Sequence, residues 1–229
     1  MPVRKKAPED LTAKKALALE IIQRLKAEYP DAGCTLDYDH AWQLLVSVRL
    51  AAQCTDARVN IVVEELFAKY PSVAALAAAE PEDIEAIVKP CGLGHSKARD
   101  ISACMRMLRD KYDCRVPDTF EELLALPGVG RKSANLIMGD VFGKPAIVTD
   151  THCIRLCNKI GLVDGIKEPQ KVEMALWKII PPEEGSDLCH RFVMHGRAVC
   201  NARKPECEKC CLKDICRTAR EAAGQQAEP

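Results

Sequence analysis

The stretch LPGVGRKSA at residues 126–134 determines the fold, because two closely spaced glycines place a tight turn between two helical segments. Glycine permits a turn that an ordinary side chain would obstruct. A helix predicted over 119–125 enters this turn, and an apolar-rich helix over 133–142 leaves it. The second helix begins with free backbone amides, which favour a phosphate group. A glycine turn can also be only a turn, but the full string predicts a phosphate-binding element formed by Gly128, Val129, Gly130 and Arg131.

Lys132 follows this turn at an unusual position. A cation in the first turn of a helix opposes the helix dipole and is poorly placed for stability. The same field favours the neutral amine, which a lysine nucleophile needs. The alternative interpretation is a lysine that holds phosphate as a point charge.

The stretch AIVTDTH at residues 146–152 carries an acid at the start of another predicted helix. Asp150 is expected to cap this helix. A carboxylate near an active amine can also orient it, accept protons and stabilise positive charge that develops on a sugar. We therefore predict that Lys132 and Asp150 form the catalytic pair. His152 is expected to be a structural hydrogen-bonding residue.

The stretch CNARKPECEKCCLKDIC at residues 200–216 is typical of a metal centre. Its C-x6-C-x2-C-x5-C spacing brings four thiols together in a loop with little apolar material, where a metal–thiolate core supplies folding energy. Four thiolates suit zinc or a [4Fe–4S] cluster, and a single CxxC flanked by lone cysteines favours the cluster. The alternative is a loop of unrelated thiols. Cys211 breaks the spacing and is predicted to be a bystander; the predicted ligands are Cys200, Cys207, Cys210 and Cys216.

Composition excludes a secreted disulfide scaffold. The chain has 229 residues and 13 cysteines, an odd number, and its opening MPVRKK precedes no apolar signal region. No apolar run reaches the length of a membrane span. We expect a soluble, cytoplasmic protein whose remaining eight cysteines are small apolar fillers: Cys34, Cys54, Cys91, Cys104, Cys114, Cys153, Cys157 and Cys189.

The charge distribution indicates one local anion-binding face. Lysines and arginines number 33, as do aspartates and glutamates, so the net charge of zero argues against a general nucleic-acid coat. Between residues 197 and 220, however, basic residues outnumber acidic ones by seven to three. This surplus predicts contact with an anion, or alternatively a solvated charged loop.

Apolar periodicity predicts an all-α protein, because helical spacing recurs and no stretch alternates like a β-strand. Segment 41–53 is apolar on nearly all sides, as a buried central helix should be. Prolines and capping residues separate the segments. Besides those at the glycine turn, helices are predicted over 11–28, 41–53, 57–69, 72–78, 81–88, 96–112, 151–160, 168–180 and 185–197.

In its motifs and their order, the chain resembles bacterial endonuclease III, a family of bifunctional DNA glycosylases of the helix-hairpin-helix superfamily. The resemblance rests on the LPGVGRK hairpin, the VTDTH segment and the cysteine loop. It extends from about Ala16 to Cys216. It includes LAAQCTD at 50–56 and CGLGHSKA at 91–98, which are similar to LSAQATD and IGLYNSKA in that family.

The resemblance implies two helical domains with a DNA cleft between them. Residues 33–144 would form the six-helix domain that ends with the hairpin. The N-terminal segment 1–32 would pack with residues 145–229 to form the [4Fe–4S] domain. Lys132 and Asp150 would face each other across the cleft. The protein would be a cytoplasmic, nucleoid-associated monomer that acts on double-stranded DNA with damaged bases or abasic sites.

The implied activity is base excision repair: removal of oxidised pyrimidines followed by AP-lyase cleavage through a Lys132 Schiff base. Gln53 would fill the gap left by the extruded base, and Leu93 would wedge into the opposite strand. Asp56 would be a supporting acid or an N-cap. His95 would lie where the opposite base is read, and the cluster loop would present Arg203 and Lys204 to phosphates.

Four positions depart from the family pattern. Arg49 lies in a segment predicted to be buried, so it requires a partner or a solvent edge. Gly94 and His95 replace a bulkier Tyr-Asn pair, and this change is expected to affect recognition of the opposite base. Ala51 replaces a serine that is expected to line the damaged-base pocket.

Three alternative functions remain. An adenine glycosylase of the same superfamily normally lacks a lysine at position 132 and has a further C-terminal domain, whereas this chain has the lysine and ends soon after Cys216. A glycosylase for mismatched thymine or other lesions is the second. The third, from a different class, is a non-catalytic DNA-binding or electron-transfer iron–sulfur protein, against which the presence of both Lys132 and Asp150 argues.

Overall fold

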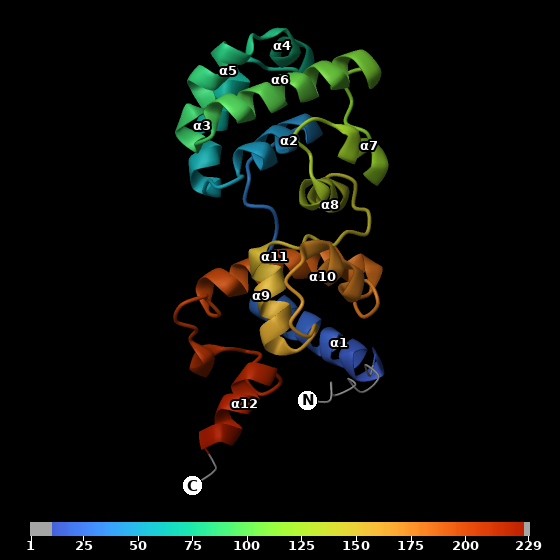
Figure 1. Cartoon of the computed structure of the whole chain (residues 1–229), viewed down its shortest axis with the longest axis vertical. Helices are drawn as coiled ribbons and strands as arrows, with labels where there is room; N and C mark the ends of the chain where they lie inside the picture. Colours follow the sequence, from blue (N-terminus) through green and yellow to red (C-terminus); the bar gives the residue numbers. More distant parts are fainter. Residues whose placement is uncertain (1–10, 227–229) are drawn as a thin grey trace, which may run out of the picture. The chain divides into compact units, whose positions relative to one another are not determined.

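The computed structural model describes residues 11–226, in which all regular secondary structure is helical and no strand occurs (Figure 1). The all-α prediction is confirmed. The opening MPVRKK segment lies outside the described residues. In residues 11–226, twelve α-helices and three short 3₁₀-helices occur in the order α1 (Leu11–Glu28), α2 (Ala41–Leu50), α3 (Asp56–Lys69), α4 (Val73–Ala78), α5 (Pro81–Val88), η1 (Lys89–Cys91), α6 (Gly94–Lys111), α7 (Phe120–Ala125), α8 (Arg131–Asp140), α9 (Thr151–Ile160), α10 (Pro169–Leu176), η2 (Pro182–Glu184), α11 (Gly185–Ala198), η3 (Cys207–Lys209) and α12 (Arg217–Gln226).

Two compact units divide the described chain. The central unit comprises Cys34–Lys144 and contains α2 to α8. The terminal unit comprises the described residues up to Gly33 together with those from Pro145 onward, and it contains α1 and α9 to α12.

The central unit is built around one apolar core to which nearly all its helices contribute. Helix α6 packs against α4 and α5 (Figure 1). Helix α2 is buried along most of its length, as its apolar sequence predicts. Side-chain caps and a proline set the helix starts: Thr55, Ser72 and Thr119 accept bonds from their own helices, and Pro81 is the first residue of α5.

The terminal unit buries a stripe of α1 against later helices. Ala18, Ile21, Ile22 and Leu25, at helical spacing, are all buried. Helix α1 packs on α11, α11 packs on α9, and α12 packs on α9 (Figure 1). The N-terminal helix is therefore part of the same unit as the cysteine loop.

Several helix boundaries differ from those predicted, and one helix was not predicted. Helix α8 spans Arg131–Asp140 rather than 133–142, and α10 ends at Leu176 rather than at residue 180. Helix α2 ends at Leu50 because residues 51–54 form turns and bends in which Gln53 has a φ of 58°. Helix α6 begins at Gly94, two residues early. Helix α12 was not predicted, because its sequence RTAREAAGQQ carries no large apolar residue.

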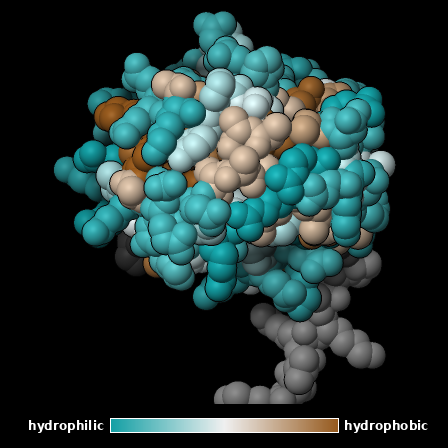
Figure 2. Space-filling view, turned by 90° about the horizontal axis from the view of Figure 1, so that it is seen from above, coloured by the Kyte–Doolittle hydropathy of each residue, from teal (hydrophilic) through white to brown (hydrophobic). Residues whose placement is uncertain are grey.

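The face of the molecule shown in Figure 2 is mostly hydrophilic, with hydrophobic residues in small patches. Among the described helices, none combines the length and hydropathy needed to cross a membrane.

Candidate active site and cysteine loop

The glycine turn between α7 and α8 has the predicted position, but its two glycines differ in role. Gly128 has a φ of 76°, and a Cβ atom there would lie 2.9 Å from the Cβ of Asp100, so glycine is required. Gly130 has a φ of −98° and open space where a Cβ would lie. The prediction that a side chain would obstruct the turn is therefore right for Gly128 and wrong for Gly130.

Arg49 packs against the glycine turn and is held there by polar contacts with α6. Its guanidinium forms an ion pair with Asp100, with a 2.8 Å contact from Nη2, and donates to the Ser96 hydroxyl at 3.2 Å. The aliphatic part of Arg49 lies against the position of Gly128, where an added Cβ would be 3.1 Å from its Cδ. The expectation that this arginine requires a partner is confirmed, and the partner lies under the hairpin.

Lys132 is exposed at the second position of α8. No hydrogen bond or ion pair joins its amine to another described residue. The amides of residues 131–133 form the free first turn of α8, which is the feature that suits an anion. Val129 is half-buried in the turn, and the Arg131 guanidinium lies over the Phe120 ring, 4.8 Å from its centroid. The lysine is thus available to a ligand that approaches the hairpin.

Asp150 belongs to the terminal unit, where it is the N-cap of α9. Its Oδ1 accepts a 2.7 Å bond from the amide of Cys153, which confirms the predicted cap. Oδ2 has no partner among the described residues, so this oxygen is available for a second task. His152 contacts Arg155 at 3.3 Å and lies against Gly196, as a structural role requires.

Gln53 and Leu93 are the tips of two neighbouring turns in the central unit. Both are exposed, and both have left-handed backbones, with φ values of 58° and 52°. Leu93 is 56% exposed although it is a large apolar residue. A left-handed backbone is unfavourable for a side chain such as leucine, and retained strain is typical of functional positions. These two residues are therefore strong candidates for a functional role.

The other predicted contact residues of the central unit have partners within the fold. The Asp56 carboxylate accepts a 2.7 Å bond from the Thr35 hydroxyl. The N-cap of α3 is Thr55, so the predicted capping role of Asp56 is wrong. The His95 ring lies 3.0 Å from a carboxylate oxygen of Glu85 and is otherwise exposed.

The cysteine loop and neighbouring residues line a cavity of about 280 Å³. Four of its five cysteines line this cavity, and they are the four predicted ligands: Cys200, Cys207, Cys210 and Cys216. Cys211 does not line it, and its carbonyl instead accepts a 2.9 Å bond from Arg24 in α1. The cavity's remaining wall includes Ala219, Ala222 and Ala223, on one face of α12.

The donor set around this cavity consists of sulfur atoms. The four thiols that line it suit a metal centre with thiolate ligands, whether a zinc ion or an iron–sulfur cluster.

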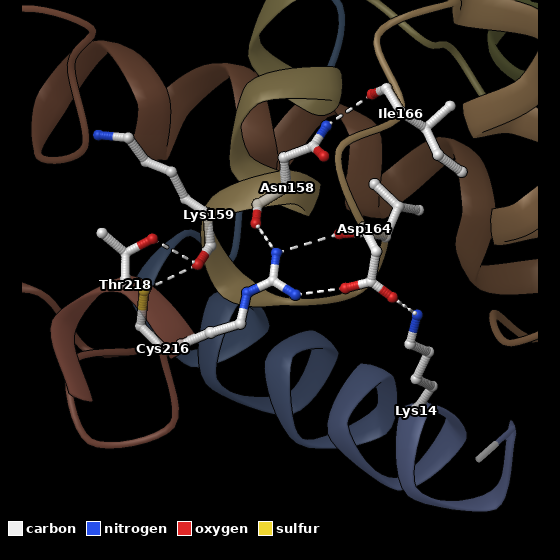
Figure 3. Close-up of polar contacts among 9 residues, drawn as sticks. Lys14, Asn158, Lys159, Asp164, Ile166, Cys216 and Thr218 are labelled. Carbon is white, nitrogen blue, oxygen red and sulfur yellow. Dashed lines mark hydrogen bonds and ion pairs between the residues drawn. The ribbon is translucent and has the colours of Figure 1, made fainter. Parts of the chain in front are cut away.

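Polar contacts from several helices fasten the loop. Arg155 donates to the Cys200 carbonyl, and His195 Nε2 lies 3.3 Å from the Cys210 sulfur. The guanidinium of Arg217 pairs with Asp164 and donates to the carbonyl of Asn158 at 2.6 Å. Figure 3 shows this network, in which Lys14 reaches Asp164 from α1 at 2.9 Å. Arg217, the residue after Cys216, is thereby bonded directly to α9 and, through Asp164, to Lys14 of α1.

Ion pairs with acidic side chains leave fewer unpaired basic residues around the cysteine loop than the sequence predicts. Lys209 pairs with Glu206, Lys213 with Glu208, and Arg217 with Asp164. Arg203 and Lys204 remain exposed in a turn closed by two 2.6 Å bonds between Asn201 and the backbone of Lys204. These two are the predicted phosphate contacts.

Most of the eight cysteines expected to be fillers are buried. Cys91, Cys104, Cys153, Cys157 and Cys189 lie in the interior, and burial raises the pKa of the Cys104 thiol to about 12. Cys34 and Cys54 are half-buried. Cys114 is exposed, so that prediction is wrong for this residue.

The sequence reasoning missed Lys97. This lysine is fully buried in α6, and its amine donates to the carbonyls of Leu50 at 2.8 Å and Cys91 at 2.9 Å. The signal was its spacing: Lys97 precedes Ile101, Met105 and Leu108 on the buried stripe of the helix. A lysine in line with an apolar stripe requires buried acceptors.

Comparison with known proteins now identifies the class of protein. Residues 46–182 match the model of the HhH-GPD superfamily base excision DNA repair protein. An endonuclease III of Synechocystis sp. is 43% identical, covering 91% of this chain and 95% of the relative. That of Escherichia coli K12 is 38% identical, covering 88% and 95%. The chain belongs to the endonuclease III family.

Solved structures agree with this assignment. A trapped endonuclease III–DNA covalent intermediate has a TM-score of 0.86 at 39% identity, covering 91% of this chain and 98% of that one. A thermostable thymine-DNA glycosylase at 23% identity has the same fold, with a TM-score of 0.79 over 93% of this chain and all of that one. The protein is a DNA glycosylase with AP-lyase activity in base excision repair, and the predicted main function is favoured over its alternatives.

Proposed function

We propose that the protein removes oxidised pyrimidines from duplex DNA and that Lys132 is its nucleophile. The observation that carries the assignment is an exposed lysine amine without a partner, next to the free amides of α8, in a chain whose solved relative is a covalent DNA intermediate. The amine attacks the sugar C1′ and the damaged base leaves as its anion; the C1′–O4′ bond then breaks as an amine proton passes to O4′, which creates a protonated imine. Loss of a C2′ proton then expels the 3′ phosphate by β-elimination.

Asp150 is the proposed acid–base partner. One oxygen is fixed by the Cys153 amide, which orients the carboxylate, and the other is available to accept a proton from Lys132 or to stabilise positive charge on the sugar. The bond from the Cys153 amide thus orients the Asp150 carboxylate, and its second oxygen is proposed to act as the acid–base group.

Extrusion of the damaged base assigns roles to the exposed tips. Rotating a base out of the stack costs a few kcal/mol, which inserted side chains offset. We propose that Gln53 fills the vacated space and Leu93 enters the opposite strand. His95 would contact the opposite base, and Asp56 would support Gln53 through its place at the start of α3.

Backbone contacts position the duplex. We propose that the hairpin at Gly128, Val129, Gly130 and Arg131 binds one phosphate region, and that Arg203 and Lys204 bind another. Gly130 supports this role, because open space where a Cβ would lie allows close approach of a ligand to the backbone.

The four cavity-lining cysteines are proposed to hold a [4Fe–4S] cluster. Such a cluster, when bound, supplies folding energy and no open coordination site. In this proposal the terminal unit is the iron–sulfur domain and the central unit is the helix-hairpin-helix domain. The protein would act as a monomer on chromosomal DNA in the cytoplasm, associated with the nucleoid.

Borohydride trapping tests the nucleophile. Wild type should form a covalent adduct with a duplex that carries one oxidised pyrimidine, whereas Lys132→Ala should form none. Lys111→Ala, which alters an exposed lysine at the end of α6, is the matched control and should trap like wild type. An adduct formed by Lys132→Ala would contradict the assignment. Base release without any wild-type adduct would instead indicate a glycosylase without the lyase step.

A further inference from the structure

The turns that carry Gln53 and Leu93 each begin where a helix ends. Leu50 is the last residue of α2, and Cys91 is the last residue of η1. The last carbonyls of a helix have no partner within it, so each requires another donor. Gln53 follows the first of these carbonyls by three residues, and Leu93 follows the second by two.

One side chain satisfies both carbonyls. The Lys97 amine donates to the Leu50 oxygen at 2.8 Å and to the Cys91 oxygen at 2.9 Å, and Lys97 is entirely buried. A lysine near the C-terminal end of a helix also interacts favourably with the helix dipole. The two turns therefore meet at a single nitrogen atom.

Other observations agree that the two turns form one structure. Burial raises the pKa of the Cys91 thiol to about 11, and the neighbouring Cys54 thiol is the second-largest cause. The two thiols, one from each turn, therefore lie close together. Helix α3, which follows the first turn, packs against η1. Burial lowers the pKa of Lys97, as expected for a cation that has only carbonyl oxygens as partners.

We propose that Lys97 is a positioning residue that joins the two turns, so that Gln53 and Leu93 enter the DNA duplex as one rigid pair. This inference rests on the proposed function of the two tips. It explains why two exposed, left-handed residues keep their conformation in the free protein: the carbonyls beneath them are fixed to the same atom. Without this bond, each tip would adopt its own lower-energy backbone.

Replacement of Lys97 by methionine tests the proposal, since methionine keeps the buried chain and removes the donor. Base excision from a duplex with an oxidised pyrimidine should fall about 10- to 100-fold, because misplaced groups lose rate steeply. β-Elimination at an abasic site in a single-stranded oligonucleotide should stay within about twofold of wild type, since no base has to be extruded there. Lys89→Met, at an exposed lysine in η1, should leave both rates unchanged.

A spectroscopic readout separates positioning from general stability. With 2-aminopurine opposite the lesion, wild type should raise its fluorescence on binding, because an inserted tip unstacks it, and Lys97→Met should not. An equal fall in both rates, or no fall in either, would contradict the proposal. If Lys97→Met does not fold, Lys97→Gln, which can still donate to one carbonyl, is subjected to the same comparison. Loss of trapping by wild type itself would contradict the proposed function instead.

Discussion

The cysteine loop and the two tips at Gln53 and Leu93 are both irregular segments, but they are held in different ways. The loop is bonded to α1, α9 and α11 by several ionic and hydrogen-bonding contacts, and four of its thiols face one cavity. The tips have exposed side chains and left-handed backbones, and one buried amine joins them from below.

This difference separates stability from function. Dense bonding of the loop to the terminal unit is what a structural metal centre needs, because ligand geometry has to be kept while the metal binds. Exposed strain at the tips destabilises the free protein, and strain of this kind clusters at functional positions. Substitutions in the loop should therefore reduce stability first, and substitutions at the tips should reduce activity first.

Loss of a proposed cluster ligand is expected to have the largest effect. Cys207→Ser should remove the visible absorbance of the proposed [4Fe–4S] cluster and lower the unfolding temperature by about 10–20 °C, as a loss of about 5 kcal/mol implies for a chain of this size. Absorbance spectra and thermal unfolding followed by circular dichroism measure both. Cys211→Ser, which alters the cysteine outside the cavity, should keep the colour. A colourless but fully stable Cys207→Ser protein would contradict the structural role.

Removal of the Arg217 guanidinium should have the next largest effect on stability. Arg217→Met leaves the carbonyls of Asn158 and Val163 without this donor, which should cost about 2 kcal/mol. Urea denaturation measures the difference. Arg220→Met, an exposed arginine of the same helix, should change stability by less than about 0.5 kcal/mol. Equal effects of the two substitutions would show that the network in Figure 3 does not fasten the loop.

The tips should show the opposite pattern. Leu93→Gly suits a left-handed backbone, so stability should change by less than about 1 kcal/mol while base excision falls about tenfold. Single-turnover excision and urea denaturation provide the two numbers. Asp113→Gly, at another exposed left-handed residue, is the control and should leave excision unchanged. A Leu93→Gly protein with a large loss of stability but normal excision would contradict the contrast drawn between the tips and the cysteine loop.

The smallest expected effect is a dependence of folding stability on pH. Hydrogen bonds from Lys14, and then Arg217, lower the pKa of Asp164 below its ordinary 3.8. A carboxylate with a lowered folded-state pKa stabilises the fold above its unfolded pKa, and this contribution is lost as pH falls through the folded value. Asp164→Asn should therefore cost about 1 kcal/mol at neutral pH and progressively less below 3.8. A cost that does not depend on pH would show that charge is not the cause.

The sequence predicted the fold well because local signals coincide with helix ends. Pro81, Thr119 and Asp150 begin helices by rules that need only neighbouring residues. Helix α12 was missed because its face toward the cysteine cavity is mostly alanine, which gives little apolar signal. The end of α2 was placed three residues late because the left-handed backbone of Gln53 has no glycine to announce it.

The site was predictable where covalent spacing defines it. Four cysteines at fixed intervals determine which thiols face the cavity, and Cys211 was excluded by the same spacing. Lys97 was not predictable in this way, because its partners are backbone carbonyls contributed by two distant segments. Arg49 illustrates the intermediate case: its need for a partner was evident, but Asp100 was not identifiable as that partner.

Mapping the trapped adduct would identify the nucleophile. Wild-type protein would be reduced with borohydride on a lesion-containing duplex, digested with protease and nuclease, and sequenced by mass spectrometry. We expect the sugar remnant to be attached to Lys132, directly after the hairpin. Attachment to any other lysine or to an amino terminus would contradict it.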